Sequence, residues 1–284
     1  MKKLLLIFTI GLFTALLLFG CNNIDPNASP QMITESPTMS LPTATPEQTP
    51  EVTPPPVEPT ETPVPPPPTP TPAPPVPLIN KIKMTAEQRA GKVAYITIDD
   101  GPSRNTPALL AMLRGKNVKV TFFVLGRNAE AHPQYIKDIA ADGHVIGNHS
   151  YSHVYKQIYA SPDTLREEIV HTNNVIKNIL GQDYQVTLFR FPGGLKQSDP
   201  AYVQVVTDLG MDFYAWNIDP KDSGGSKSTT EALVAKFNSQ LGSMKHPVIL
   251  MHDAANKDTS VQALAVMIDQ LRAKGYSFDV ITRP

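Results

Sequence analysis

The uneven distribution of proline constrains this chain more than any other feature of its sequence. Of the 29 prolines, 20 lie between Pro26 and Pro77, and only nine lie from Pro102 to Pro284. Proline fixes φ and lacks a backbone N–H, so a segment this rich in it forms neither helices nor sheet ladders. The 284 residues therefore do not form one globular domain. About 200 residues, from position 81 onward, are left for a single domain of ordinary size.

The N-terminus has the pattern of an export signal. Lys2 and Lys3 precede an apolar run from Leu4 to Gly20, and positions 18–21 resemble the lipobox of bacterial lipoproteins. We expect residues 1–20 to be a lipoprotein-type signal peptide, Cys21 to be lipidated, and residues 21–80 to form a Pro/Thr-rich disordered linker. An uncleaved membrane anchor is the alternative. Both interpretations place the domain outside the cytoplasm, attached to the cell membrane and facing the cell wall.

Charge and cysteine content exclude two further possibilities. Cys21 is the only cysteine, so no intrachain disulfide can form and the domain must be held together by packing. From Lys81 onward the chain carries 23 basic and 20 acidic residues, a balance of +3. This excess is too small to indicate a nucleic-acid partner. We expect a monomer that does not bind nucleic acid.

From Gly91 onward, short apolar runs alternate with amphipathic stretches. The apolar runs predict seven strands, at 93–98, 119–124, 144–147, 187–190, 213–217, 247–251 and 278–281. The amphipathic stretches predict six helices, at 107–116, 133–141, 164–180, 200–209, 230–241 and 260–274. This alternation is typical of an α/β fold with a mostly parallel sheet. The count alone leaves open whether the sheet is an open doubly wound one or a closed barrel.

Polar residues cluster where five of the predicted strands end. The clusters are Asp99 to Pro102, Asn148 to His153, Arg190 to Gly194, Trp216 to Asp222, and His252-Asp253. Parallel α/β folds build their sites at the C-terminal ends of their strands. We therefore expect the five clusters to meet in one pocket.

Most of these signals are weak when taken singly. His149 and His153, at i and i+4, would share one face of a helix and could bind a metal, but such a pair also occurs on surfaces and at helix caps. Asp99 and Asp100 after a buried strand would place two like charges on the pocket floor, and these need a cation or a proton. Structural explanations also exist for Arg190, Trp216 and His252.

In this order, the five clusters resemble the polysaccharide deacetylases, carbohydrate esterase family 4, which carry the NodB-homology domain. The resemblance covers about residues 91–284. It implies a distorted (β/α) barrel over residues 81–284 and metal-dependent removal of N-acetyl groups from amino-sugar polymers. The expected substrate is peptidoglycan N-acetylglucosamine or a chitooligosaccharide-like glycan. The expected cofactor is one divalent metal ion, zinc first, with cobalt or nickel as alternatives.

The resemblance also implies a role for each residue of the site. The implied metal ligands are Asp100, His149 and His153. The implied catalytic residues are Asp99 as base and His252 as acid, held respectively by Arg190 and Asp222. The implied substrate contacts are the Gly193 amide at the oxyanion, Leu250 at the acetyl methyl group, and Trp216.

Three positions depart from the family pattern. Gly193 stands where an aromatic residue is common, Ser223 where a Trp is common, and Ile98 where a Phe is usual. Trp216 or Tyr214 could wall the acetyl pocket in place of the absent Trp. No departure removes a ligand, the base or the acid, so we expect activity. The alternatives are O-deacetylation of acetylxylan and a non-catalytic carbohydrate-binding protein.

Overall fold

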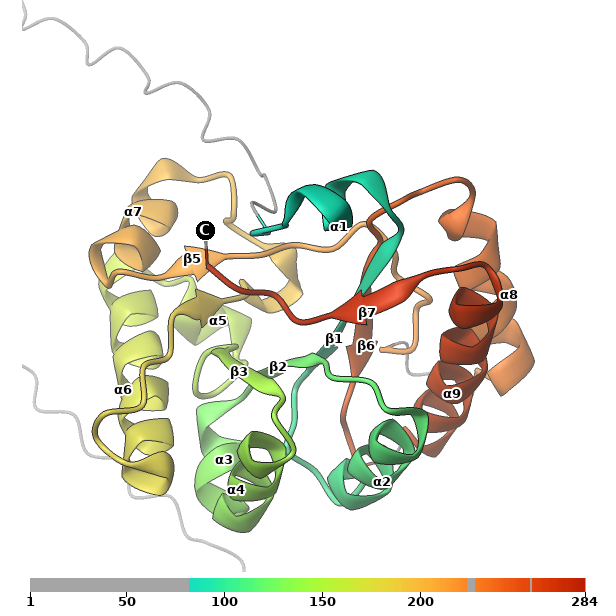
Figure 1. The fold of residues 1–284 in the computed structure, drawn as a ribbon. Helices are drawn as coiled ribbons and strands as arrows, with labels where there is room; N and C mark the ends of the chain where they lie inside the picture. Colours follow the sequence, from blue (N-terminus) through green and yellow to red (C-terminus); the bar gives the residue numbers. More distant parts are fainter. Residues whose placement is uncertain (1–81, 224–227, 256, 284) are drawn as a thin grey trace, which may run out of the picture. The chain divides into compact units, whose positions relative to one another are not determined.

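The computed structural model describes residues 82–223, 228–255 and 257–283 (Figure 1). The predicted signal peptide, Cys21 and the predicted linker lie outside the described residues. Within the described part of the chain, none of the helices combines the length and the apolar character that a bilayer span requires.

The described residues form seven strands and a set of helices between them. The strands are β1 (Val93–Asp99), β2 (Thr121–Val124), β3 (Val145–Asn148), β4 (Leu188–Phe189), β5 (Asp212–Phe213), β6 (Val248–His252) and β7 (Ser277–Asp279). The longer helices are α2 (Thr106–Lys116), α4 (Pro133–Ala141), α6 (Pro162–Leu180), α7 (Pro200–Asp208), α8 (Thr230–Leu241) and α9 (Asp258–Ala273). Three short helices were not predicted: α1 (Ala86–Ala90), α3 (Gly126–Ala131) and α5 (Tyr155–Ile158).

All strand pairs in the sheet are parallel, in the order β5-β4-β3-β2-β1-β6, with β7 beside the first half of β1. The two outer strands of this order are joined by an irregular segment. β5 ends at Phe213, and Ile218 then forms an isolated parallel bridge with Ile249 of β6. The sheet thus curls into a distorted barrel, which resolves the choice that the strand count left open. The helices flank it, with α6 and α7 on one side in Figure 1 and α8 and α9 on the other.

β1 separates two hydrophobic cores by the alternation of its side chains. All seven of its residues are buried. Ala94, Ile96 and Ile98 pack in the large core beneath the helices. Val93 and Tyr95 pack in a smaller core inside the barrel, with Phe123, Leu188, Tyr214, Val248 and Ile281. Because side chains alternate along a strand, Asp99 lies on the same face as Val93 and Tyr95, at the C-terminal end of the barrel interior.

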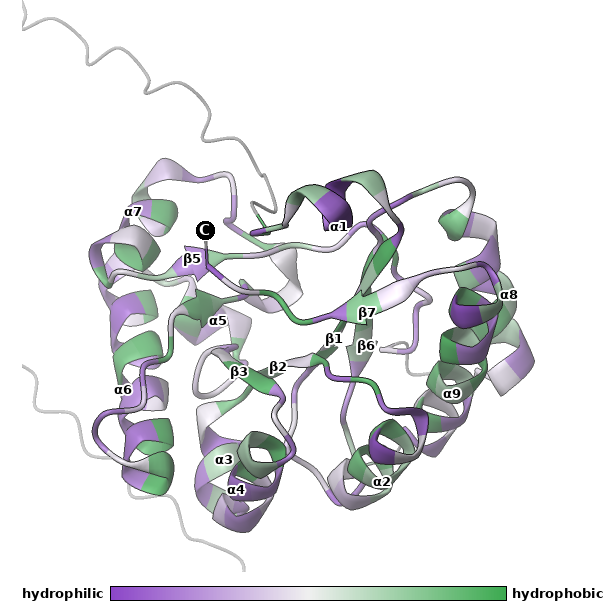
Figure 2. Cartoon of the chain, viewed as in Figure 1, coloured by the Kyte–Doolittle hydropathy of each residue, from purple (hydrophilic) through white to green (hydrophobic). Residues whose placement is uncertain are grey.

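The outer helices are amphipathic, with their hydrophilic residues on the outside in Figure 2. α6 begins at a capping box, in which the Ser161 side chain accepts from the Thr164 N–H and the Thr164 side chain accepts from the Ser161 N–H. At the other end of the domain, Ile281 is fully buried in the barrel core and Arg283 pairs with Asp212 at 2.8 Å. The segment after β7 therefore crosses to β5, as Figure 1 shows.

Candidate active site

Asp99 ends β1 inside the barrel, where it pairs with a buried arginine. Its exposed fraction is 2%, and its Oδ1 accepts from Arg190 Nη1 at 2.9 Å. Burial raises the pKa of the Asp99 carboxyl, and the charge and hydrogen bond of Arg190 oppose that rise. A buried carboxylate beside one fixed cation can accept a proton without leaving its place.

Arg190 also fills the break in the barrel wall after β5. Its Nε donates to the Tyr214 carbonyl at 2.9 Å and its Nη2 to the Ala215 carbonyl at 3.1 Å. Its Nη1 donates to Thr97 Oγ1 at 2.6 Å, and its guanidinium lies 4.2 Å from the centre of the Phe123 ring. The Arg190 side chain, which holds Asp99, thus also donates hydrogen bonds to backbone carbonyls of the irregular segment between β5 and β6.

Three potential metal ligands converge beside Asp99. One ligand atom from each of Asp100, His149 and His153 lies within 4.8 Å of the other two. Asp100 Oδ1 is 3.8 Å from His149 Nε2 and 3.6 Å from His153 Nε2. His149 Nε2 also lies 3.6 Å from Asp99 Oδ2. Two imidazoles and one carboxylate are a ligand set typical of catalytic zinc sites.

The two histidines do not share a helix, so the prediction of a common helical face is wrong. β3 ends at Asn148, and α5 begins only at Tyr155. In the loop between them, Ser150 and His153 adopt left-handed φ values of 71° and 57°. These two turns fold the loop back so that both rings face Asp100. The i, i+4 spacing indicated that His149 and His153 could act together, but it did not predict the loop that brings the two rings together.

Two observations show that this site fits a metal ion. Asp100 Oδ1 is a buried oxygen without a hydrogen-bond partner among the described residues. His149 Nδ1 lies 2.8 Å from the Arg190 carbonyl, which can only accept, so Nδ1 carries the proton and Nε2 keeps its lone pair. Burial, only partly opposed by Asp100, lowers the pKa of His149 to about 3, which keeps the imidazole neutral.

His252 and Asp222 form a second pair at the barrel mouth. His252 Nδ1 is 2.6 Å from Asp222 Oδ1, and the His252 backbone N–H donates to Asp222 Oδ2 at 2.9 Å. Burial opposes the charged imidazolium, but the hydrogen bond and charge of Asp222, with Asp99 and Asp100, outweigh it and raise the pKa of His252 to about 9. His252 is therefore protonated at neutral pH, with Nε2–H as the donor that Asp222 leaves free.

The register of β1 and β6 sets His252 beside Asp99. Asp99 is paired with His252 and Thr97 with Leu250 across these two strands. Leu250 alternates with the inward-facing Val248 and has an exposed fraction of 4%. It therefore lies at the mouth of the barrel, two residues before His252.

Gly193 lies in a tight turn near the potential metal ligands. It adopts φ 64°, and a Cβ there would lie 2.8 Å from the Tyr155 hydroxyl. The Tyr155 ring is 5.2 Å from the His153 ring. The Gly193 N–H has no hydrogen-bond acceptor in the part of the chain that the structure describes. Trp216 borders the same turn, because a Cβ on Gly194 would be 3.1 Å from its ring.

Ser223, at the position where the family commonly has a Trp, is exposed. It directly follows the buried Asp222, and residues 224–227 after it lie outside the described residues. Trp216, which borders the Gly193-Gly194 turn, lies with its ring centre 5.6 Å from the Arg190 guanidinium.

Sequence reasoning missed several residues that hold the site. Glu168, in the middle of α6, accepts from the backbone N–H groups of Tyr151 and Ser152, both at 2.7 Å, and so fixes the loop that carries the histidines. Asn128 of α3 donates to the Asp100 carbonyl at 2.7 Å. Neither residue lies in a motif, and only the packing of helix against strand end brings them there. The sequence placed Thr97 in a predicted strand, but it did not indicate that Thr97 Oγ1 accepts a hydrogen bond from Arg190.

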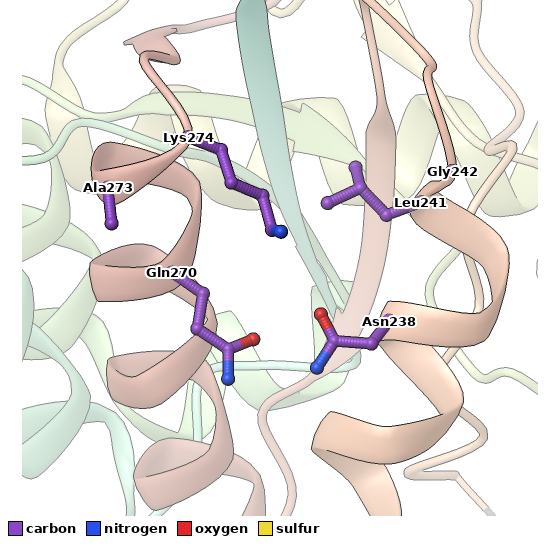
Figure 3. Close-up of a pocket in the computed structure, with 6 residues that line it drawn as sticks. All are labelled: Asn238, Leu241, Gly242, Gln270, Ala273 and Lys274. Atoms are coloured by element: carbon purple, nitrogen blue, oxygen red, sulfur yellow. The ribbon is translucent and has the colours of Figure 1, made fainter.

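Two pockets differ in their relation to this site. An open pocket of about 360 Å³ is lined by Asp100 and His153, two of the three potential metal ligands. A larger pocket of about 630 Å³ lies between the C-terminal ends of α8 and α9, where Figure 3 shows Asn238, Gln270 and Lys274 around it. This larger pocket is lined by none of the predicted site residues. In barrels the end opposite the C-terminal strand ends contributes stability rather than chemistry.

Comparisons with known proteins agree with this geometry. Residues 86–214 match the family model for polysaccharide deacetylase. A peptidoglycan-N-acetylglucosamine deacetylase of Bacillus cereus is 31% identical over 191 residues, which cover 66% of this chain and 68% of the relative. A chitin deacetylase of Colletotrichum lindemuthianum is 32% identical over 190 residues, 64% of this chain and 74% of the relative.

Solved structures give the same result. The catalytic domain of a peptidoglycan N-acetylglucosamine deacetylase from Eubacterium rectale has a TM-score of 0.61 at 33% identity, covering 68% of this chain and 91% of that one. A CE4 family pseudoenzyme from Bacillus anthracis has a TM-score of 0.59 at 26% identity, covering 67% of this chain and 64% of that one. With a parallel barrel, an Asp/His/His set and these relatives, this chain belongs to the polysaccharide deacetylases of carbohydrate esterase family 4.

Proposed function

We propose that this protein is a metal-dependent deacetylase that removes N-acetyl groups from an amino-sugar polymer, either from the N-acetylglucosamine of peptidoglycan or from a chitooligosaccharide-like glycan. One juxtaposition carries the proposal: the three potential ligands lie beside a buried carboxylate, and a protonated histidine lies next to that carboxylate on the neighbouring strand. Amide hydrolysis needs a base for the attacking water and an acid for the departing nitrogen, and this arrangement supplies one of each.

Asp100, His149 and His153 would hold the metal, with zinc as the first choice and cobalt or nickel as alternatives. When bound, a divalent ion supplies positive charge at the substrate carbonyl and makes water more acidic. The neutral His149 and the unpaired Asp100 oxygen support this assignment.

The other residues act on the substrate and its protons. Asp99 takes a proton from the water that attacks the acetyl carbon, and Arg190 keeps Asp99 in place. The free N–H of Gly193 would donate to the carbonyl oxygen as it becomes negative. His252 Nε2–H then gives its proton to the nitrogen as the C–N bond breaks, so that acetate and a free amine leave. Leu250 and Trp216 would contact the acetyl methyl group.

We also propose how the chain is organised. Residues 1–20 form a signal peptide, Cys21 is lipidated, residues 21–80 form a linker, and residues 81–284 form the catalytic domain. The anchor would hold the enzyme on the outer face of the cell membrane, where peptidoglycan is the nearest acetylated polymer. We propose that it acts as a monomer.

Acetate release by the purified protein tests the activity. Peptidoglycan, chitooligosaccharides and acetylxylan would be compared after chelation and after addition of zinc, cobalt or nickel. We expect no release after chelation and restored release from the amino-sugar polymers with metal. Activity on acetylxylan alone would replace the N-deacetylase with an O-deacetylase, and glycan binding without any release would show a non-catalytic protein.

Variants test the roles. Asp99→Asn and His252→Gln should lose turnover by orders of magnitude and keep one bound metal, whereas His153→Ala should bind metal weakly. His246→Gln is the matched control, because the His246 ring contacts the Gln88 carbonyl outside the site. Loss of metal from Asp99→Asn would contradict its role as base.

A further inference from the structure

Two arginines line the open pocket beside the potential metal ligands. Besides Asp100 and His153, it is lined by Arg104, Arg127 and His132. Arg104 precedes α2, whereas Arg127 is the second residue of α3 and His132 follows that helix. Two separate elements thus bring two arginines and a histidine to one pocket, whose volume of about 360 Å³ is near the lower end of the usual range for small-ligand sites.

The charges of these two arginines are not neutralised by an ion pair in the described part of the chain. Among the described residues, neither Arg104 nor Arg127 forms an ion pair, unlike the exposed Arg114 and the half-buried Arg166, which pair with Asp142 and Asp208. Arg104 Nε donates to the Ala255 carbonyl, which orients its guanidinium. Both arginines are exposed, so their unpaired charge meets solvent or a ligand.

The acidic groups of the pocket are already engaged. Asp253, with an exposed fraction of 2%, accepts from Ser103 Oγ and Thr106 Oγ1, each at 2.5 Å. Asp100 belongs to the metal set. The side chains that remain available to a ligand in this pocket are therefore mainly positive.

The surroundings of Gly193 have a different character. Tyr155 and Leu195, which flank this turn, have exposed fractions of 43% and 45%, and Trp216 lies beside Gly194. None of these residues lines the cationic pocket. A glycan bound at the metal ligands would thus meet exposed apolar side chains near one unit and unpaired arginines near another.

We propose that the Arg104–Arg127 pocket binds a carboxylate carried by the sugar next to the one that loses its acetyl group. The inference rests on the proposed function and makes it more specific: the preferred substrate is an acidic glycan, in which acetylated amino sugars alternate with sugars bearing a carboxylate. Guanidinium groups match carboxylates in geometry and charge. Because the carboxylate takes no part in the reaction, its binding lowers KM and leaves kcat unchanged.

The test compares three substrates of equal length with the full-length protein, purified in detergent and loaded with zinc. They are an alternating glycan with free carboxylates, the same glycan with its carboxylates converted to methylamides, and a neutral chitooligosaccharide. Arg104→Gln/Arg127→Gln should raise KM for the carboxylate glycan about tenfold or more, since hydrogen bonds between charged groups are lost. The two neutral substrates should change by less than about twofold. Arg89→Gln, on α1 at the N-terminal end of β1, is the charge-matched control.

High salt should reduce the wild-type preference for the carboxylate glycan, because both arginines are exposed. Equal kcat/KM for the carboxylate and methylamide glycans in the wild type would overturn the inference and leave the deacetylase function intact. An equal loss on all three substrates in the double variant would also overturn it. If no substrate releases acetate, the proposed function fails, and calorimetry of carboxylate-glycan binding to wild type and double variant still decides whether the pocket binds this group.

Discussion

The chemistry of single residues in this site is set by their partners. His252 would have an ordinary pKa in water, but Asp222 keeps it charged in spite of burial. His149 is kept neutral by burial, and the Arg190 carbonyl selects which of its nitrogens faces Asp100. At neutral pH, one histidine of the site is thus positively charged and the other is neutral, which suits His252 to donate a proton and His149 to bind a metal.

The pair of Asp222 and His252 predicts the pH dependence of activity. Because His252 must be protonated to act as acid, kcat/KM should fall as pH rises through about 9. Asp222→Asn removes the charge that raises this pKa and leaves the burial that lowers it, so the alkaline limb should move to lower pH. Its raised pKa also means that His252 stabilises the fold fully below its unfolded pKa of about 6.5 and loses that contribution as pH rises through about 9.

A pH profile of kcat/KM for wild type and Asp222→Asn measures this shift. Asp219→Asn is the control, because Asp219 pairs with Lys221 on the same loop and not with His252. An alkaline limb that stays in place in Asp222→Asn would show that another group sets it.

Substitution of Gly193 should affect both stability and activity, whereas the same substitution at Gly210 should affect stability alone. Gly193→Ala and Gly210→Ala both place a side chain at left-handed φ, 64° and 68°, and each should lower the free energy of unfolding by about 1–2 kcal/mol. No atom of the described residues lies within 4 Å of a Cβ on Gly210, whereas a Cβ on Gly193 displaces the exposed Tyr155 ring. Activity should therefore fall in Gly193→Ala and persist in Gly210→Ala. Denaturant unfolding and kcat/KM check both, and equal activities would place Gly193 outside the site.

At the scale of elements, the site depends on irregular backbone between regular strands. The loop from His149 to His153 turns through two left-handed residues, and the segment after β5 leaves the sheet and rejoins it at Ile218. In both places a side chain from elsewhere replaces the missing backbone partners, Glu168 in the first and Arg190 in the second.

Glu168 should therefore control metal affinity from outside the ligand set. Glu168→Ala removes the acceptor for two backbone N–H groups and frees the His153 loop, so metal affinity should fall about 10–100-fold. Glu168→Gln keeps one acceptor oxygen and should lose less. Glu167→Ala, one residue earlier and exposed on the same helix, is the control. Titration with zinc or cobalt measures the affinities, and wild-type affinity in Glu168→Ala would remove Glu168 from this role.

The regular parts of the domain could be predicted from the sequence, and the irregular parts could not. Short apolar runs predicted all seven strands, because strands of a parallel sheet are buried on both faces. Amphipathic stretches predicted the six long helices. Strand 213–217 was predicted too long, since Arg190 rather than a neighbouring strand binds the carbonyls of Tyr214 and Ala215. The family resemblance predicted which residues would meet, but Glu168 and Asn128 reach the site only through tertiary packing.

At the scale of the whole molecule, membrane attachment by the proposed anchor and catalysis by the barrel should be separable. Cys21→Ser should abolish lipid attachment and release the protein from the membrane fraction, while the purified variant keeps wild-type kcat/KM on soluble glycan. Mass spectrometry of the N-terminal peptide and membrane fractionation check this. Absence of lipid from the wild-type Cys21 peptide would show that the enzyme is either secreted or held by an uncleaved signal anchor.

The pairing of β1 has a consequence for when this barrel can form. β1 is the first strand of the domain, yet most of its ladder is made with β6 and β7, the last two, and its Val93 faces Ser277. Until those late residues have been made, the strand that carries Asp99 has only β2 beside its second half. Folds dominated by such distant pairs assemble slowly. A chain that is still being made thus stays incompletely folded, which is the state that the proposed export across the membrane would require, and the barrel would then close outside the cytoplasm.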